Sequence, residues 1–131
     1  MTRAPQPPAD VTVFYDGACP LCSAEIGLYR AQDRDGALCL VDVSRPEAAL
    51  PPGVTQAEAL ARFHVRVADG RVLSGAAAFV AVWQSLPGWR WLARLARVPG
   101  MLWAMERGYR LFLPLRPAIV AVYRRLARKA A

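Results

Sequence analysis

The apolar residues of the first half of the chain fall into short runs separated by turn-forming residues. Residues 11–15 are β-branched and aromatic and run into Asp16-Gly17, which predicts a buried strand that ends in a turn. Pro20 begins a segment of apolar residues spaced among small and polar ones, which predicts a helix to about residue 32. Residues 37–43 form a nearly continuous apolar run, typical of a strand covered on both faces. Strand, helix and strand in this order predict a right-handed βαβ unit.

The pattern over the next forty or so positions predicts a second unit of helix, hairpin and helix. Thr55-Gln56-Ala57-Glu58 has the form of a capping box and predicts a short helix through Arg62. Two apolar runs, 63–67 and 71–73, flank Asp69-Gly70, a pair that supplies the positive φ angles of tight hairpin turns. A further helix is predicted over 76–86, with Ser74 as its cap. We therefore expect one α/β domain over residues 11–88, with a central sheet of about four strands and flanking helices.

Beyond residue 88 the apolar residues recur at roughly helical spacing, and prolines interrupt them. Pro99-Gly100, Pro114 and Pro117 predict three short helices, the last over 118–129. Residues 89–131 are therefore interpreted as a helical C-terminal extension packed on the same domain. Residues 1–10 are polar, proline-rich and without an apolar run, which predicts a disordered segment that is not a secretory signal.

Charge divides the chain near the same position. Residues 1–88 hold seven arginines and nine acids, a net charge of −2, whereas residues 89–131 hold nine arginines, one lysine and the single acid Glu106, a net charge of +9. A basic segment that also carries tryptophans suits an anionic membrane surface or an acidic partner, and a solvated helical face has the same composition. No nucleic-acid recognition motif accompanies the charge, so nucleic acid is not expected as a partner.

The size of the chain and its cysteines limit the class of protein. A chain of 131 residues with 55% hydrophobic residues can bury one sizeable core. Three cysteines without regular spacing are not the disulfide framework of a small secreted protein. Arginines interrupt every apolar run after residue 88, so no stretch is long enough to span a membrane. We expect a cytoplasmic protein that can also lie at the inner membrane surface.

The spacing of Cys19 and Cys22 at the start of a predicted helix points to thiol chemistry. Two cysteines separated by two residues can close a small disulfide ring. The first is expected to be exposed and lies at the positive end of the helix dipole, which stabilises its thiolate. In the expected reaction Cys19 attacks a substrate disulfide, a mixed disulfide forms, and Cys22 resolves it. This chemistry needs no organic cofactor.

The same cysteine spacing also occurs in zinc sites, which leaves a metal-binding module as an alternative. The second half of such a site is missing, because the remaining candidate ligands, Cys39 and His64, lie on predicted strands. Cys39 is interpreted as a buried core thiol, and no residue is assigned to a metal. A third alternative is a protein that binds a membrane surface or a partner through its basic C-terminal helices.

Four further residues are candidates for the predicted redox site. Asp16 can take protons during thiol exchange or accept hydrogen bonds from loop amides, and we place it with the two catalytic cysteines. Gly17 and Pro20 are supporting residues of the turn and of the first helical turn, where proline removes an amide that would contact the sulfur. His64, the only histidine, can act as an acid or base for Cys22 or bond a backbone carbonyl.

The octapeptide Tyr15-Asp16-Gly17-Ala18-Cys19-Pro20-Leu21-Cys22 resembles the motif of the DCC family of thiol-disulfide oxidoreductases. Later positions, over about residues 11–117, are similar to that family in order and spacing: His64-Val65, Asp69-Gly70, Gly75-Ala76, Leu86-Pro87, Val98-Pro99-Gly100, and Tyr109 with Arg116. The resemblance implies a thioredoxin-like fold and a thiol or disulfide substrate, either a protein or a low-molecular-weight thiol. It also implies that Tyr109 and Arg116 brace the C-terminal helices against the core. One departure is that Arg62-Phe63 stands where thioredoxins and glutaredoxins place a cis-proline.

Overall fold

The computed structural model describes residues 11–33 and 36–130, so the segment 1–10 that we predict to be disordered lies outside the described residues. In chain order the secondary structure consists of β1 (Val11–Tyr15), α1 (Pro20–Gln32), β2 (Leu38–Asp42), α2 (Gln56–Ala61), β3 (His64–Val67), β4 (Val72–Ser74), α3 (Ala76–Ser85), the 3-10 turn η1 (Pro87–Trp89), α4 (Arg90–Leu95) and α5 (Met101–Ala130). Up to α3, every strand and helix predicted from the sequence is present, with bounds close to those predicted.

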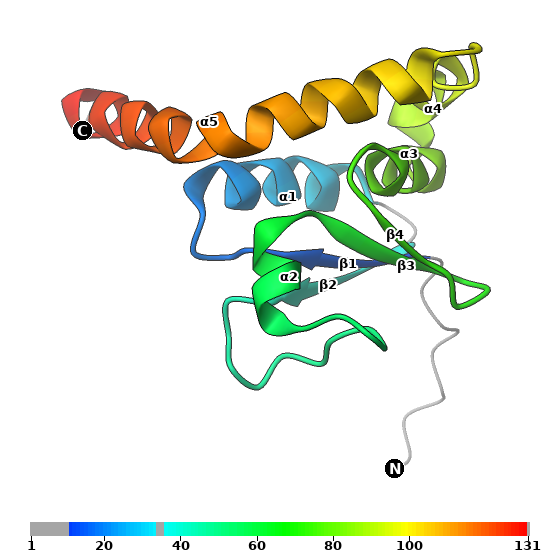
Figure 1. Cartoon of the computed structure of the whole chain (residues 1–131), viewed down its shortest axis with the longest axis horizontal. Helices are drawn as coiled ribbons and strands as arrows, with labels where there is room; N and C mark the ends of the chain where they lie inside the picture. Colours follow the sequence, from blue (N-terminus) through cyan, green and yellow to red (C-terminus); the bar gives the residue numbers. More distant parts are fainter. Residues whose placement is uncertain (1–10, 34–35, 131) are drawn as a thin grey trace.

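The four strands form one sheet in the order β2-β1-β3-β4 (Figure 1). The pair β1 and β2 is parallel, as a βαβ unit requires, whereas β3 runs antiparallel to β1 and forms a hairpin with β4. In this register Val13 lies between Leu40 and Val65. A βαβ unit followed by a hairpin and a helix on one sheet is consistent with the predicted thioredoxin-like fold.

The two faces of the sheet pack against different helices because side chains alternate along each strand. Val13 and Val65 face α1 and α3, and together with Val82 and Leu86 they are fully buried in the main core. Phe14 faces the other way, into a smaller cluster with α2. Full burial of a side chain of this size contributes roughly 1.5–3 kcal/mol. The main core therefore holds α1 against the sheet, with the N-terminus of this helix next to the end of β1.

The expectation of three short helices after residue 88 is wrong, because Pro114 and Pro117 lie inside the single helix α5. A proline removes one backbone donor and crowds the preceding turn, which either kinks a helix or ends it. Here α5 continues with a change of direction near its middle (Figure 1). Tyr109 and Arg116, on either side of Pro114, both bond the backbone of the α/β domain. These contacts hold both parts of the helix against the domain.

The start of α3 also differs from its prediction. Its N-cap is Gly75, with a φ of 66°, rather than Ser74. The cap acceptor comes from α5, where Glu106 Oε2 accepts a hydrogen bond from Ala76 N at 2.9 Å. The same carboxylate pairs with Arg62 at 2.6 Å. A Cβ atom at position 75 would lie 2.3 Å from the Arg62 guanidinium, so the close approach of these groups requires glycine.

Cys39, expected to be a buried core thiol, is exposed. Its strand β2 is at the edge of the sheet, and Cys39 pairs with Thr12. The Thr12–Cys39 pair lies on the same face of the sheet as Phe14. On this face α2 packs only around Phe14, so no helix covers the Cys39 thiol. Among the described residues, no helix is long and apolar enough to cross a lipid bilayer.

Candidate redox site

The two cysteines of the motif lie at the N-terminal end of α1. Cys19 is the N-cap residue, Pro20 occupies the first helical position, and Cys22 follows within the first turn. Cys19 N donates to the Asp16 carbonyl at 3.1 Å, and the Cys19 carbonyl accepts from Ser23 N at 3.0 Å. The turn after β1 therefore delivers the first thiol to the positive end of the helix dipole, where a thiolate is stabilised.

Gly17 shapes this turn through a close contact with the end of β2. Its backbone N donates to Asp42 Oδ1 at 2.8 Å, and a Cβ atom at position 17 would lie 2.1 Å from Asp42 Oδ2. Ser44 donates to the same carboxylate from both its backbone N and its hydroxyl. Sequence reasoning missed Asp42 as part of the site. The sequence did contain a signal for it: Asp42 is an acid at the carboxyl end of a strand predicted to run parallel to β1. The carboxyl ends of parallel strands meet at one edge of a sheet, which brings Asp42 near the loop after β1.

Asp16 bonds both its own loop and a distant helix. Its Oδ1 accepts from Ala18 N at 3.0 Å, and its Oδ2 lies 3.3 Å from Arg116 Nη2 of α5. The carboxylate therefore forms the turn and pairs with a cation. Both of its oxygens have partners.

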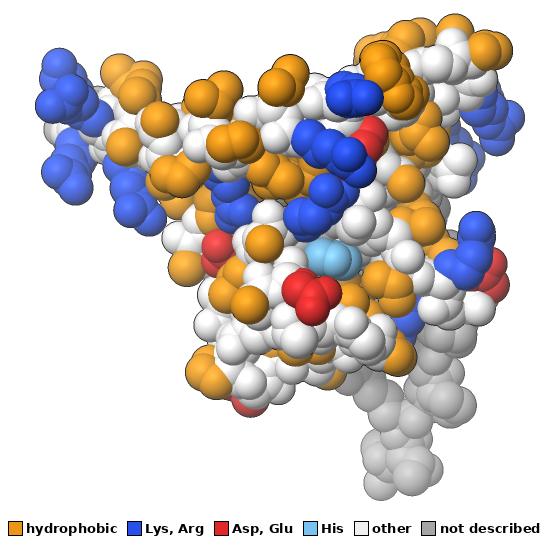
Figure 2. Space-filling model, viewed as in Figure 1, with side chains coloured by type: hydrophobic (Ala, Val, Ile, Leu, Met, Phe, Trp, Pro, Cys, Tyr) orange, Lys and Arg blue, Asp and Glu red, His pale blue; other side chains and the backbone are white. Residues whose placement is uncertain are grey.

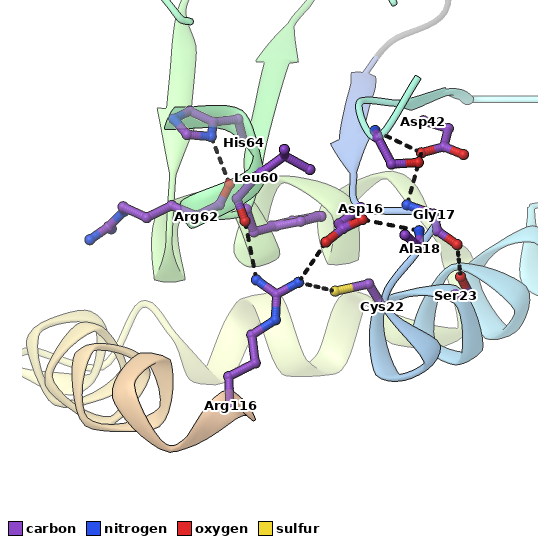
Figure 3. A network of polar contacts seen from close by, with 12 residues as sticks. Asp16, Gly17, Ala18, Cys22, Ser23, Asp42, Leu60, Arg62, His64 and Arg116 are labelled. Carbon is purple, nitrogen blue, oxygen red and sulfur yellow. Dashed lines mark hydrogen bonds and ion pairs between the residues drawn. The ribbon is translucent and has the colours of Figure 1, made fainter. Parts of the chain in front are cut away.

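Arg116, in the middle of α5, contacts the cysteine motif at the start of α1, as Figure 3 shows. Its Nη1 donates to the Leu60 carbonyl at 3.3 Å, and its Nη2 donates to Cys22 Sγ at 3.2 Å as well as pairing with Asp16. The sequence analysis connected Arg116 only to bracing of the C-terminal helices. Its spacing of seven residues from Tyr109 places both on one helix face, a signal that is visible only if α5 is taken to run through Pro114.

The two thiols ionise at different pH. Burial, together with a hydrogen bond to the Cys19 sulfur, raises the pKa of Cys22 to about 12. For Cys19, burial alone would raise the pKa, but a hydrogen bond from the Cys22 backbone and the Arg116 guanidinium outweigh burial and hold it below its ordinary value. Cys19 is therefore the thiol of the pair that ionises at the lower pH, and Cys22 is the thiol that holds its proton more tightly.

Cys22 lines a small cavity of ≈ 70 Å³ that it shares with an ionisable side chain, Glu25. Glu25 Oε1 accepts from the Tyr29 hydroxyl at 2.6 Å, and that hydroxyl in turn accepts from Trp83 Nε1 at 3.3 Å. Burial raises the pKa of Glu25. Sequence reasoning missed Glu25, although its position three residues after Cys22 on a predicted helix placed both on one face.

Cys19 lies on the other side of Arg116, in an open groove of ≈ 530 Å³. Cys19, expected to be exposed, is only 7% exposed, because it lies under the groove walls. The groove runs between the start of α1, the end of α2 and the middle of α5, and its walls are mainly apolar, formed by Ala18, Leu60, Ala61, Leu113, Pro117 and Val120. Cys19 therefore faces this groove, whereas Cys22 lines the small cavity.

The structure does not bring His64 together with the cysteines. His64 is buried, its Nδ1 bonds the Arg62 carbonyl at 2.8 Å, and it pairs with Phe14 in the sheet. Its ring belongs to the face covered by α2, whereas Cys22 lies on α1 on the opposite face, and Figure 3 shows the two residues well apart. Of the two roles that the sequence allowed for His64, the structure shows the hydrogen bond to a backbone carbonyl and not a contact with Cys22.

The segment where thioredoxins and glutaredoxins carry a cis-proline is bonded to α5 instead. Within residues 11–33 and 36–130 there is no cis peptide bond. Phe63 N donates to the Tyr109 hydroxyl at 2.8 Å, and the Phe63 carbonyl accepts from Gly75 N. The same part of the chain holds no cluster of three or more His, Cys, Asp or Glu side chains placed to bind a metal ion.

A dithiol at the N-terminus of the first helix of a thioredoxin-like domain, with the lower pKa at the first cysteine, defines the class of thiol-disulfide oxidoreductases. A family model described as DCC1-like thiol-disulfide oxidoreductase matches residues 13–128. The chain belongs to this family. No curated protein and no solved structure matches the sequence significantly.

Proposed function

We propose that this protein exchanges thiols and disulfides with its substrate through a mixed disulfide at Cys19. The observation that carries the proposal is the position of Arg116, whose guanidinium lies 3.2 Å from Cys22 Sγ and 3.3 Å from Asp16. A permanent positive charge beside two thiols at a helix N-terminus favours the thiolate, which is the reactive form in disulfide exchange. Membership in the DCC1-like family supports the same class of reaction.

The exchange proceeds in two steps that balance electrons and protons. The Cys19 thiolate attacks one sulfur of a substrate disulfide, the substrate S–S bond breaks, and the departing thiolate takes up a proton. The Cys22 thiol then loses its proton and attacks Cys19 Sγ, which releases the second substrate thiolate and leaves a Cys19–Cys22 disulfide. The substrate gains two electrons and the protein loses two. The reverse sequence oxidises a dithiol substrate.

Three residues assist these steps. Asp16 is a positioning residue that orients Arg116 and closes the loop before Cys19, since both of its oxygens are engaged. Glu25 accepts the proton of Cys22, because a pKa of about 12 makes unaided ionisation costly at neutral pH and Glu25 lines the same cavity. Gly17 is required by the contact of the loop with Asp42.

The substrate is a protein or low-molecular-weight thiol or disulfide that fits the groove above Cys19. The groove walls are mainly apolar, and Arg124 also lines the groove. Substrates with an apolar segment next to the reactive sulfur would bury area against Leu113 and Val120 of α5.

The experiment that tests this function titrates the thiols of the purified protein across a series of glutathione redox buffers, with bound zinc measured in the same sample. We expect a reversible two-electron transition that Cys19→Ser and Cys22→Ser each abolish. Cys39→Ser is the matched control, because Cys39 is exposed on β2 and should leave the transition unchanged. Stoichiometric zinc, or thiols that never pair, would contradict the oxidoreductase and favour the metal-binding module.

A further inference from the structure

The outward side of α5 carries apolar side chains that no part of the described chain covers. We call Leu111, Leu115, Val122 and Leu126 the outer stripe, because their spacing of four, seven and four residues places them on one side of the helix. Leu111 is 72% exposed and Leu115 is 58% exposed. Figure 2 shows hydrophobic side chains along the upper edge of the molecule, over α5. Tyr109 and Arg116, which bond the domain, lie on the other side of this helix.

Further exposed apolar residues lie next to the outer stripe in sequence, at α4 and the start of α5. Trp103 is 65% exposed, and the Arg107 guanidinium stacks 4.9 Å from its ring centre. The large exposed hydrophobic residues of this part are Trp91, Leu95, Val98 and Leu102. A helix that exposes several large apolar side chains among basic ones is typical of an interaction site.

Charge decides which partner this surface fits. Residues 89–131 carry nine arginines and one lysine, and the basic residues of α5 include Arg107, Arg125 and Lys129 beside the outer stripe. The one acid of the segment, Glu106, is already bonded to Arg62 and to the start of α3. Two copies of the chain would bring like charges together, and nucleic acid would leave the apolar stripe uncovered. An anionic lipid surface satisfies both the charge and the apolar side chains.

We propose that α5 lies along the surface of a bilayer that contains anionic lipids, with the outer stripe among the acyl chains and Arg107, Arg125 and Lys129 at the headgroups. Tryptophan next to arginine is typical of such interfacial helices. Because the groove of Cys19 lies on the inward side of α5, docking places this thiol about one helix diameter, roughly 10 Å, from the acyl chains that the outer stripe enters. The interaction uses neither thiol, so it is independent of the redox function.

The test is sedimentation of the full-length protein with vesicles of phosphatidylglycerol mixed with phosphatidylcholine, and with vesicles of phosphatidylcholine alone. We expect binding to the anionic vesicles that weakens when salt is raised from about 0.1 M to about 0.5 M. Leu111→Gln/Leu115→Gln should bind about tenfold more weakly or worse, because two leucines no longer enter the acyl region. Leu28→Gln is the matched control, since Leu28 is also 58% exposed but belongs to α1. Both variants change exposed residues, and circular dichroism verifies their folding.

Three results would overturn the proposal. The first is wild-type protein that stays in the supernatant with anionic vesicles. The second is equal binding by the wild type and the Leu111→Gln/Leu115→Gln variant. The third is a dimer, detected by analytical ultracentrifugation, that forms through the same stripe and leaves vesicles unbound. Cys19→Ser should bind vesicles as the wild type does, so failure of the redox function and failure of membrane binding are distinguishable.

Discussion

The role of Arg116 leads to a quantitative prediction for Arg116→Gln. The substitution keeps a hydrogen-bonding side chain but removes the positive charge beside the thiols. Two unit charges about 4 Å apart interact by about 4 kcal/mol at an effective dielectric constant of 20. The carboxylate of Asp16, 3.3 Å from the same guanidinium, offsets a large part of this stabilisation. We therefore expect a net loss of about 1.4 kcal/mol in thiolate stability, which corresponds to an acid dissociation constant of Cys19 that is about tenfold smaller.

The assay is the rate of alkylation by iodoacetamide as a function of pH, measured in Cys22→Ser/Cys39→Ser protein so that only Cys19 reacts. The midpoint of the rate profile reports the pKa of Cys19, and Arg116→Gln should move it to higher pH. Arg110→Gln is the control, because Arg110 is also on α5 but pairs with Glu106 instead of the sulfurs. An unchanged midpoint in folded Arg116→Gln protein would refute the electrostatic role of Arg116.

Three further predictions concern the loop, the cavity and the cap of α3. Gly17→Ala should lower the free energy of unfolding by about 1–3 kcal/mol in urea denaturation, because its Cβ atom collides with Asp42. The control is Gly27→Ala in α1, where a Cβ atom meets open space; this variant should have an unchanged free energy of unfolding or gain up to about 1 kcal/mol. If Gly17→Ala and Gly27→Ala lost equal stability, the contact between residue 17 and Asp42 would not be the cause. Glu25→Gln should lengthen the lifetime of the mixed disulfide at Cys19 about tenfold or more, as measured by mass spectrometry, while the rate of Cys19 alkylation stays the same. Resolution of the mixed disulfide at the wild-type rate would exclude Glu25 as the proton acceptor. Glu106→Gln should cost about 1 kcal/mol at pH 7, since this pair is partly exposed.

The Glu106 prediction carries a definite pH dependence. Burial alone would raise the pKa of Glu106, but hydrogen bonds from Arg62, Ala76 and Arg110 hold it below its ordinary value in the folded protein. A carboxyl group with a lowered folded-state pKa stabilises the protein above its unfolded pKa of 4.5, and that stability is lost as the pH falls through the folded value. The stability difference between wild type and Glu106→Gln should therefore shrink in thermal melts below about pH 4.5. A constant difference down to pH 2 to 3 would indicate that charge is not the cause.

The local sequence determined the α/β domain and the place of the dithiol. A strand that ends in Asp16-Gly17, a proline at the first helical position and an Asp-Gly hairpin turn are signals between residues a few positions apart. Their effect on φ and ψ does not depend on distant partners, so β1, α1 and the hairpin could be predicted together with Cys19 and Cys22 at the helix start. For His64, the sequence allowed two roles, and the fold turns its ring to the Arg62 carbonyl.

Only the tertiary structure decided which distant groups reach the cysteines. Arg116 is 94 residues from Cys22, and it contacts the thiol because α5 continues through Pro114 while bonded to the domain. In the same way, Glu106 supplies the cap of α3 that the local sequence assigned to Ser74, and Cys39 is exposed because its strand is at the sheet edge. Burial, ion pairs and the pKa values of the thiols depend on which surfaces pack together. That packing minimises the free energy of the whole chain and leaves no short-range pattern in its sequence.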